Sequence, residues 1–137
     1  MAVIKKGSKK EAKPKKIKKI PEGRGIIHAK FSYNNTIFRL SKENGDIVGS
    51  QISGGTIGFR NTAKGRAATA EKTAQGIIKL AADYGINNVK LRVKNIGPGR
   101  DLAIKKILEE KSLNVEELID DTSIPHGGCR PRKRPRK

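Results

Sequence analysis

The stretch that decides the fold runs from residue 25 to residue 53 and reads GIIHAKFSYNNTIFRLSKENGDIVGSQIS. Its first part, Gly25–Tyr33, alternates between apolar and polar side chains, which is the period of a strand with one buried face. Turn signals at Asn34-Asn35 and at residues 43–46 separate this strand from two more, over Thr36–Ser41 and Ile47–Ser53. Three short strands joined by tight turns predict an antiparallel meander.

Beyond Gly54-Gly55 the pattern changes to a helical one. An Ala-rich segment with few breakers predicts a long helix from Asn61 or Thr62 to Asp83, with Gly85 as its C-cap. Residues 88–94 then alternate again and predict a strand with one apolar and one cationic face. The turn at residues 97–101 opens a second helix, whose expected buried stripe consists of Ala103, Ile104, Ile107 and Leu108.

The segment after this second helix has two interpretations. Asn114 followed by Glu117 matches a capping box for a short helix over Val115–Ile119, but a last strand around residues 115–121 fits as well. The fold class is α/β in either case, with a mixed sheet covered by helices in the order β-β-β-α-β-α and this last element left open.

The charge of the chain lies mostly at its two ends. Lys and Arg number 31 against 13 Asp and Glu, for a net charge of +18. Residues 1–24 carry +8 and residues 126–137 carry +6, which leaves +4 for the domain over residues 25–125. Neither end has enough apolar side chains to bury itself, so we expect both to be disordered alone and to lie along a nucleic acid. Such an imbalance calls for a polyanionic partner.

Length and composition exclude several other classes. A chain of 137 residues is one domain, and three Phe, two Tyr and no Trp disfavour a protein that stacks single-stranded bases on aromatic rings. There is no apolar run of about 18 residues and no secretory signal, so we expect no membrane partner and a cytoplasmic location. The lone Cys129 fits a reducing compartment. We expect no homo-oligomer.

Motifs for catalysis are missing or weak. No glycine precedes a lysine, which removes the Walker phosphate loop, and two histidines with one cysteine cannot form a four-ligand zinc site. His126 with Cys129 is a poor candidate for a nucleophile and its base, because both lie in a Gly-rich turn. A metal-dependent nuclease would have to use aspartates that mostly fall at turns or helix ends, namely Asp46, Asp83, Asp101, Asp120 and Asp121. We therefore predict no enzyme activity, no cofactor and no bound metal.

Two groups of residues suit RNA phosphates. The turn over residues 97–100 presents backbone N–H groups at a helix start, where Arg100 adds a bidentate donor. Arg60, Lys64 and Arg66 cluster at the start of the long helix, where cations oppose the helix dipole unless an anion lies nearby.

Four separate segments, in order, resemble the S eleven family of small-ribosomal-subunit proteins. They are Phe31 with Asn34-Asn35-Thr36, Ser53-Gly54-Gly55 with Gly58-Phe59-Arg60, Gly97-Pro98-Gly99-Arg100, and Ile124-Pro125-His126 with Gly128-Cys129-Arg130-Pro131 before a basic end. The resemblance covers residue 25 to the C-terminus, and Cys129 with the tail is similar to the bacterial or organellar type.

The resemblance implies a fold and a role. It implies a sheet of about five strands flanked by two helices in the order β-β-β-α-β-α-β, so that the open segment at 115–121 becomes a strand. It also implies a non-catalytic protein of the small-subunit platform, which binds ribosomal RNA, contacts neighbouring ribosomal proteins and lies near the messenger RNA exit path. A free-standing basic RNA-binding or RNA-chaperone protein is the alternative.

Resemblance and charge together predict a set of residues that contact ribosomal RNA. They are Asn34, Asn35, Gly54, Gly55, Arg60, Lys64, Arg66, Gly99 and Arg100 in the domain, His126, Arg130, Arg132, Lys133, Arg134, Arg136 and Lys137 in the tail, and Lys15, Lys16, Lys18 and Lys19 in the N-terminal arm.

Overall fold

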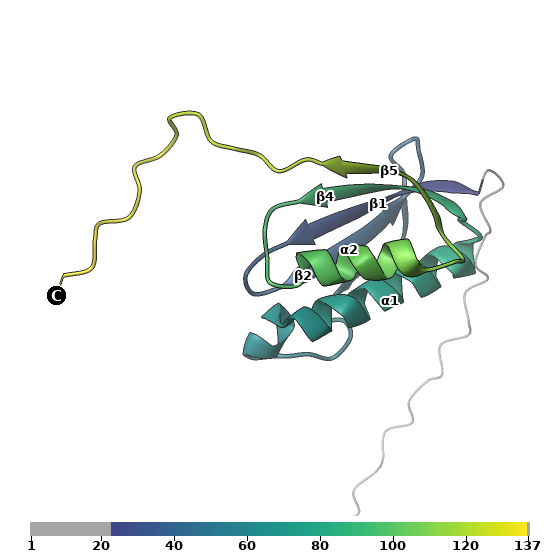
Figure 1. Cartoon of the computed structure of the whole chain (residues 1–137), viewed down its shortest axis with the longest axis horizontal. Coiled ribbons are helices and arrows are strands. Elements are labelled where there is room, and N and C mark those ends of the chain that lie inside the picture. The colour runs from purple at the N-terminus through teal and green to yellow at the C-terminus, as the bar shows by residue number, and fades with distance from the viewer. Residues whose placement is uncertain (1–22, 137) are drawn as a thin grey trace, which may run out of the picture.

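The computed structural model describes residues 23–136, in which five strands form one mixed sheet with two α-helices on one side (Figure 1). The order of the elements is the predicted β-β-β-α-β-α-β, and the segment with two interpretations is a strand. The elements are β1 (Arg24–Phe31), β2 (Thr36–Ser41), β3 (Ile47–Ser53), the 3-10 helix η1 (Asn61–Gly65), α1 (Ala67–Tyr84), β4 (Asn88–Lys94), α2 (Arg100–Glu109) and β5 (Asn114–Asp120).

The strands lie in the order β3-β2-β1-β4-β5. The first three form the predicted antiparallel meander, whereas β4 pairs in parallel with both β1 and β5 through crossovers that contain α1 and α2. Parallel strands end at the same edge of a sheet. The carboxyl ends of β1, β4 and β5 and the amino ends of both helices therefore meet at one end of the domain, on the left in Figure 1.

The core fills the space between the sheet and the two helices. On the sheet side, Ile27 pairs with Leu91 in the β1–β4 register, and both are fully buried. Phe31 and Phe38 pack edge to face with their ring centroids 5.9 Å apart. Because both α-helices cover the same face, the opposite face of the sheet carries the remaining side chains, which are mostly polar but include Ile26 and Ile37.

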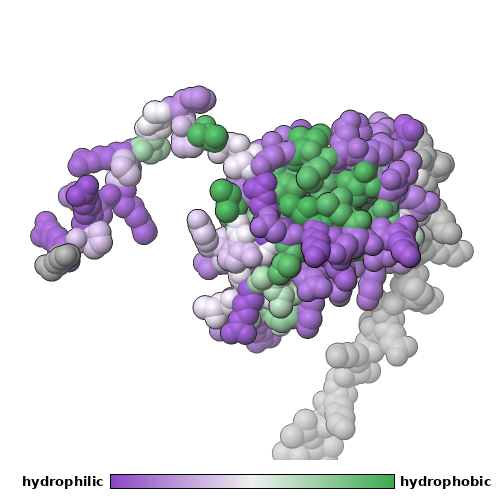
Figure 2. Space-filling view, viewed as in Figure 1, coloured by the Kyte–Doolittle hydropathy of each residue, from purple (hydrophilic) through white to green (hydrophobic). Residues whose placement is uncertain are grey.

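The expected buried stripe of α2 is only half right. Ala103 and Ile107 are fully buried, but Ile104 is partly buried and Leu108 is 53% exposed. The reason lies in the strand order: β5 is the last strand, so no further element of the described chain covers this flank of α2. Figure 2 shows the resulting apolar surface, in green, in the area between β5 and α2.

The predicted start of the long helix is wrong by about five residues. Residues 61–65 form η1, Arg66 is extended, and α1 begins only at Ala67. A side chain at Gly65 would collide with the carbonyl oxygen of Tyr33, so the chain bends where it passes the β1–β2 turn. The other end is confirmed, because Gly85 caps α1 in the left-handed conformation with φ of 73°.

The turn between β4 and α2 packs closely against the rest of the domain. A Cβ at Gly97 would lie 2.6 Å from the carbonyl oxygen of Ser32, and one at Gly99 would overlap the side chain of Ala70 in α1. These contacts hold the amino end of α2 against α1 and the end of β1.

A polar clamp joins the same turn to the end of β5. The Arg100 guanidinium donates to the carbonyl oxygen of Asn95 at 3.1 Å and pairs with the Asp120 carboxylate at 2.7 Å. The Thr122 hydroxyl, which also donates to Asp120, and then Arg100 lower the pKa of Asp120 to about 2. The carboxylate therefore stabilises the fold above the unfolded-state pKa of 3.8, and this contribution is lost as the pH falls towards 2.

Gly99→Ala is expected to lower the free energy of unfolding by about 1–3 kcal/mol, because its methyl group overpacks the contact with α1. Chemical denaturation of the full chain measures the change. Gly55→Ala is the matched control, since a Cβ there meets nothing closer than 3.8 Å. Equal destabilisation by the two substitutions would contradict the close approach at Gly99.

Thr122→Val is expected to raise the pKa of Asp120 from about 2 towards 3.8, because it removes the largest stabilising contact of the carboxylate. An NMR titration that follows the Asp120 side chain measures this pKa in both proteins. An unchanged midpoint would show that the hydroxyl does not hold the carboxylate in its charged form.

Candidate nucleic-acid interface

Candidates from three segments that are distant in the sequence lie side by side at the end of the domain where the parallel strands terminate. Asn34 and Asn35 in the β1–β2 turn and Lys64 of η1 line one hollow of about 380 Å³, together with Asn61 and Thr62 of η1. Gly54 belongs to the same place, because a Cβ there would lie 3.2 Å from Asn35 Oδ1 and 3.4 Å from the Lys64 Cα. We call Asn34, Asn35, Gly54 and Lys64 the turn cluster.

Hydrogen bonds within the β1–β2 turn determine which groups the turn cluster presents. Asn35 Oδ1 accepts from the Thr36 N–H at 3.0 Å, and the Ser32 hydroxyl donates to the Asn35 carbonyl oxygen at 2.8 Å. The exposed side-chain amide of Asn34 and the ammonium of Lys64 have no hydrogen bond or ion pair with any residue from 23 to 136. An amide and an ammonium in one hollow suit the phosphate and 2′-hydroxyl groups of RNA.

Further cations surround the amino end of α1. Arg60 and Arg66 are exposed on either side of η1, and Gly55 is exposed in the turn after β3. The first turn of α1 contains no acidic residue, and no side chain caps it. The helix dipole and these cations therefore add up to a positive potential that favours an anion.

Gly99 and Arg100, which were predicted to contact RNA, make contacts within the domain itself. Gly99 is buried against α1, and the Arg100 side chain, which is 23% exposed, is engaged by Asp120 and the Asn95 carbonyl. Their predicted contact with RNA stays a prediction. What the structure adds is a packing role for the glycine and a clamping role for the arginine, and neither role can be read from the turn sequence.

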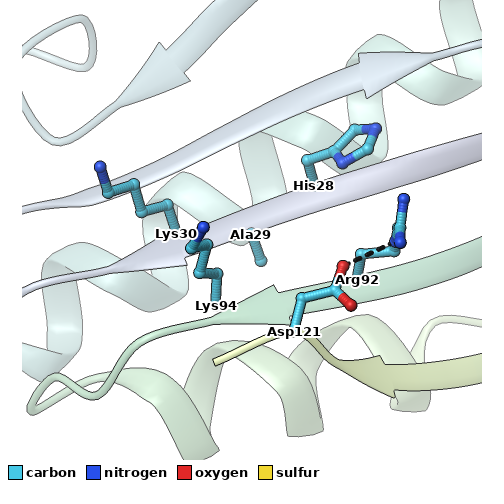
Figure 3. Close-up of a pocket in the computed structure, with 6 residues that line it drawn as sticks. All are labelled: His28, Ala29, Lys30, Arg92, Lys94 and Asp121. Atoms are coloured by element: carbon cyan, nitrogen blue, oxygen red, sulfur yellow. Dashed lines mark ion pairs between the residues drawn. The ribbon is translucent and has the colours of Figure 1, made fainter. Parts of the chain in front are cut away.

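The face of the sheet opposite the helices holds cations that the predicted set omits. His28 and Lys30 of β1, Arg92 and Lys94 of β4, and Asp121 line a hollow of about 470 Å³, where their side chains extend from the sheet (Figure 3). Lys30 and Lys94 are direct partners in the β1–β4 register. We call this surface, with the exposed Arg39 of β2, the open sheet face.

Lys30 and Lys94 carry charge that no carboxylate of residues 23–136 neutralises. Arg92 pairs with Asp121 at 2.8 Å, whereas Lys30 and Lys94 form no ion pair with any described residue. His28 Nε2 lies 2.9 Å from the Ser41 hydroxyl, and burial, followed by the nearby Arg92, lowers the pKa of His28 below 6.5. A lowered pKa favours the neutral imidazole, and the adjacent Lys30 and Lys94 repel one another unless an anion lies between them.

A signal for this surface was present in the sequence. The strict alternation of residues 88–94 predicts a cationic face that includes Lys94, and the same pattern places Lys30 on the polar face of residues 25–33. What the sequence did not supply was the strand order, which makes these two lysines neighbours.

The C-terminal tail leaves the domain at the end of β5 and extends away from it (Figure 1). It has no regular secondary structure over residues 121–136, and its predicted RNA-contacting side chains are all exposed, namely His126, Arg130, Arg132, Lys133, Arg134 and Arg136. The remaining predicted residues, Lys15, Lys16, Lys18, Lys19 and Lys137, lie outside the described residues.

Residues 23–136 contain neither a candidate metal cluster nor a helix that could span a membrane. No group of three or more His, Cys, Asp or Glu side chains is arranged to hold a metal ion there. None of the helices in this part of the chain is long and apolar enough to cross a membrane.

Comparisons with known proteins point to one family. The family described as Ribosomal protein S11 matches residues 25–136. Among curated relatives, a small ribosomal subunit protein uS11 of Thermus thermophilus is 39% identical over 130 residues, which cover 95% of this chain and 98% of the relative. The proteins of the same name in Thermotoga maritima and Chlamydia trachomatis serovar A are 39% and 38% identical over 128 residues, or 93% of this chain and 97% and 94% of theirs. The chain therefore belongs to the ribosomal protein S11 family.

Proposed function

We propose that this protein is a structural constituent of the small ribosomal subunit that binds ribosomal RNA through phosphate and shape contacts. Relatives that span nearly the whole chain bear the name of a small-subunit protein, which supports the assembly. The observation that carries the RNA contact is the distribution of exposed cations over the turn cluster, the open sheet face and the tail. The role is structural and involves no catalytic step.

The domain and the tail contribute different kinds of contact. The turn cluster and the open sheet face lie on a rigid scaffold, so their cations can match a fixed arrangement of phosphates. The tail carries six basic residues from Arg130 to Lys137, and its arginines can grip phosphates with two hydrogen bonds each. A tail of this kind becomes ordered when it threads between RNA helices.

The proposed location is the platform region, near the exit path of messenger RNA and beside neighbouring ribosomal proteins. This finer location rests on the family resemblance of its motifs. The match over residues 25–136 favours a built-in component over a free-standing RNA chaperone, because it covers the domain and most of the basic tail.

Replacing both Lys30 and Lys94 by Gln is expected to weaken binding to the small-subunit ribosomal RNA of the same organism. The slope of log K against log salt should flatten by roughly 0.7–0.9 for each phosphate that the variant no longer binds. Filter binding of the full chain over a salt series measures both quantities. The matched control is Lys105→Gln with Lys111→Gln, which removes the same charge from exposed positions on and after α2. Equal slopes for the two double variants would contradict a phosphate site on the open sheet face.

Deleting residues 130–137 should weaken RNA binding and reduce the salt slope by several counterions, with the fold intact. The deleted residues include six cations and no part of any strand or helix. Circular dichroism checks the fold, and the same binding series measures the slope. An unchanged slope in the shortened chain would show that the tail does not contact phosphates.

A further inference from the structure

One flank of α2 is apolar and uncovered. Lys106 faces α1, where its ammonium lies 3.9 Å from the Glu71 carboxylate. Ile104 and Leu108 are each two residues from Lys106, or about 200° around the helix, so they face away from α1 and towards the β5 side of the sheet. They line a hollow of about 480 Å³ whose other lining residues are Asp101, Lys105 and Glu109.

The neighbouring strand continues this surface. In the β4–β5 register Leu118 lies beside the buried Leu91, on the face that the helices cover, yet Leu118 is 55% exposed. β5 is also the last strand in the sheet, so the backbone groups of its outer edge have no partner strand among the described residues. We call Ile104, Leu108, Leu118 and the free edge of β5 the α2–β5 flank, and Figure 2 shows apolar surface in the area between α2 and β5.

The charge of this part of the chain is opposite to that of the rest. Residues 101–121 hold seven of the 13 acidic residues but only three basic ones, a net charge of −4 in a chain of +18. Asp101 of the hollow and Glu116 of β5 form no ion pair with any residue from 23 to 136, whereas Glu117 and Asp121 pair with Lys90 and Arg92 of β4. Phosphates would be repelled here, so the charge selects a cationic protein rather than RNA. A second copy of this chain is disfavoured, because two such flanks would bring acidic residues together.

We propose that the α2–β5 flank docks a basic, apolar segment of a neighbouring protein, which adds as a strand to the free edge of β5. The backbone of the segment would satisfy the edge of β5, and its alternate apolar side chains would cover Leu108 and Leu118. Its Lys or Arg side chains would pair with Glu116 and the acidic residues around the hollow. The inference rests on the proposed function in one respect: the neighbour is one that the ribosomal small subunit holds beside this chain.

Photo-crosslinking inside purified small subunits tests the proposal. In a Cys129→Ser background, Leu118→Cys carries a benzophenone probe, and the irradiated subunits are digested with ribonuclease before mass spectrometry. The expected adduct is a peptide of another protein that contains both basic and apolar residues. Leu108→Cys is a second probe on the same flank and is used where the first variant is not incorporated.

Charge reversal tests whether the acidic residues recruit the segment. Glu116→Lys should reduce the yield of the Leu118→Cys adduct about threefold or more, because it replaces an attraction by a repulsion. Glu43→Lys makes the same charge change in the exposed β2–β3 turn and should leave the yield unchanged. Equal yields in the two reversals would overturn the electrostatic part of the proposal.

A third probe separates this inference from the proposed function. Lys30→Cys on the open sheet face should give an adduct with ribosomal RNA, and its failure to do so would count against the RNA contact alone. The docking proposal is overturned where the flank probes react with RNA, with a second copy or with the N-terminal arm of the same chain. It is also overturned if neither Leu118→Cys nor Leu108→Cys gives an adduct while Lys30→Cys gives one.

Discussion

The parallel pairing of β1 with β4 is the constraint on which the rest of the molecule depends. From Ile27 in β1 and from Val89 in β4, the strands alternate between apolar and polar side chains, and the register sets Ile27 beside Leu91 and Lys30 beside Lys94. In-register alternation sends the apolar side chains of the core to one face, where burial under two helices stabilises the fold. It sends the cations to the other face, which no helix of the described chain covers. One pairing thus creates both the core and the open sheet face.

The same pairing gathers the remaining candidates at one end of the domain. Because β1, β4 and β5 run in the same direction, the turn cluster, the amino ends of α1 and α2, and the exit of the basic tail lie at a common edge. The close packing of Gly97 and Gly99 and the clamp between Arg100 and Asp120 hold that edge together. Arg100 thereby holds the turn after β4 against the end of β5. Lys64, Arg60 and Arg66 carry charges that no ion pair within residues 23–136 neutralises.

The parts of the fold that local patterns determine were predictable, and the parts that depend on strand order were not. The strands over residues 36–41, 47–53 and 88–94 and the cap at Gly85 follow from alternation and turn chemistry, and the structure confirms them. The start of α1 was missed because a tertiary contact with the Tyr33 carbonyl bends the chain at Gly65. The segment around residues 115–121 had two interpretations until pairing with β4 made residues 114–120 a strand. Leu108 fits a buried helical stripe, and only the position of β5 at the sheet edge explains its exposure.

The surfaces divide by charge, with cations on the open sheet face, the turn cluster and the tail, and acidic and apolar residues on the α2–β5 flank. From this division we infer that the protein joins RNA on one side to protein on the other. The most direct measurement is a high-resolution electron cryomicroscopy structure of the small subunit that contains this chain. We predict phosphate oxygens within about 4 Å of the Lys30 and Lys94 ammonium groups, and a protein segment along β5. RNA lying along β5, with none beside the open sheet face, would contradict this assignment of the two surfaces.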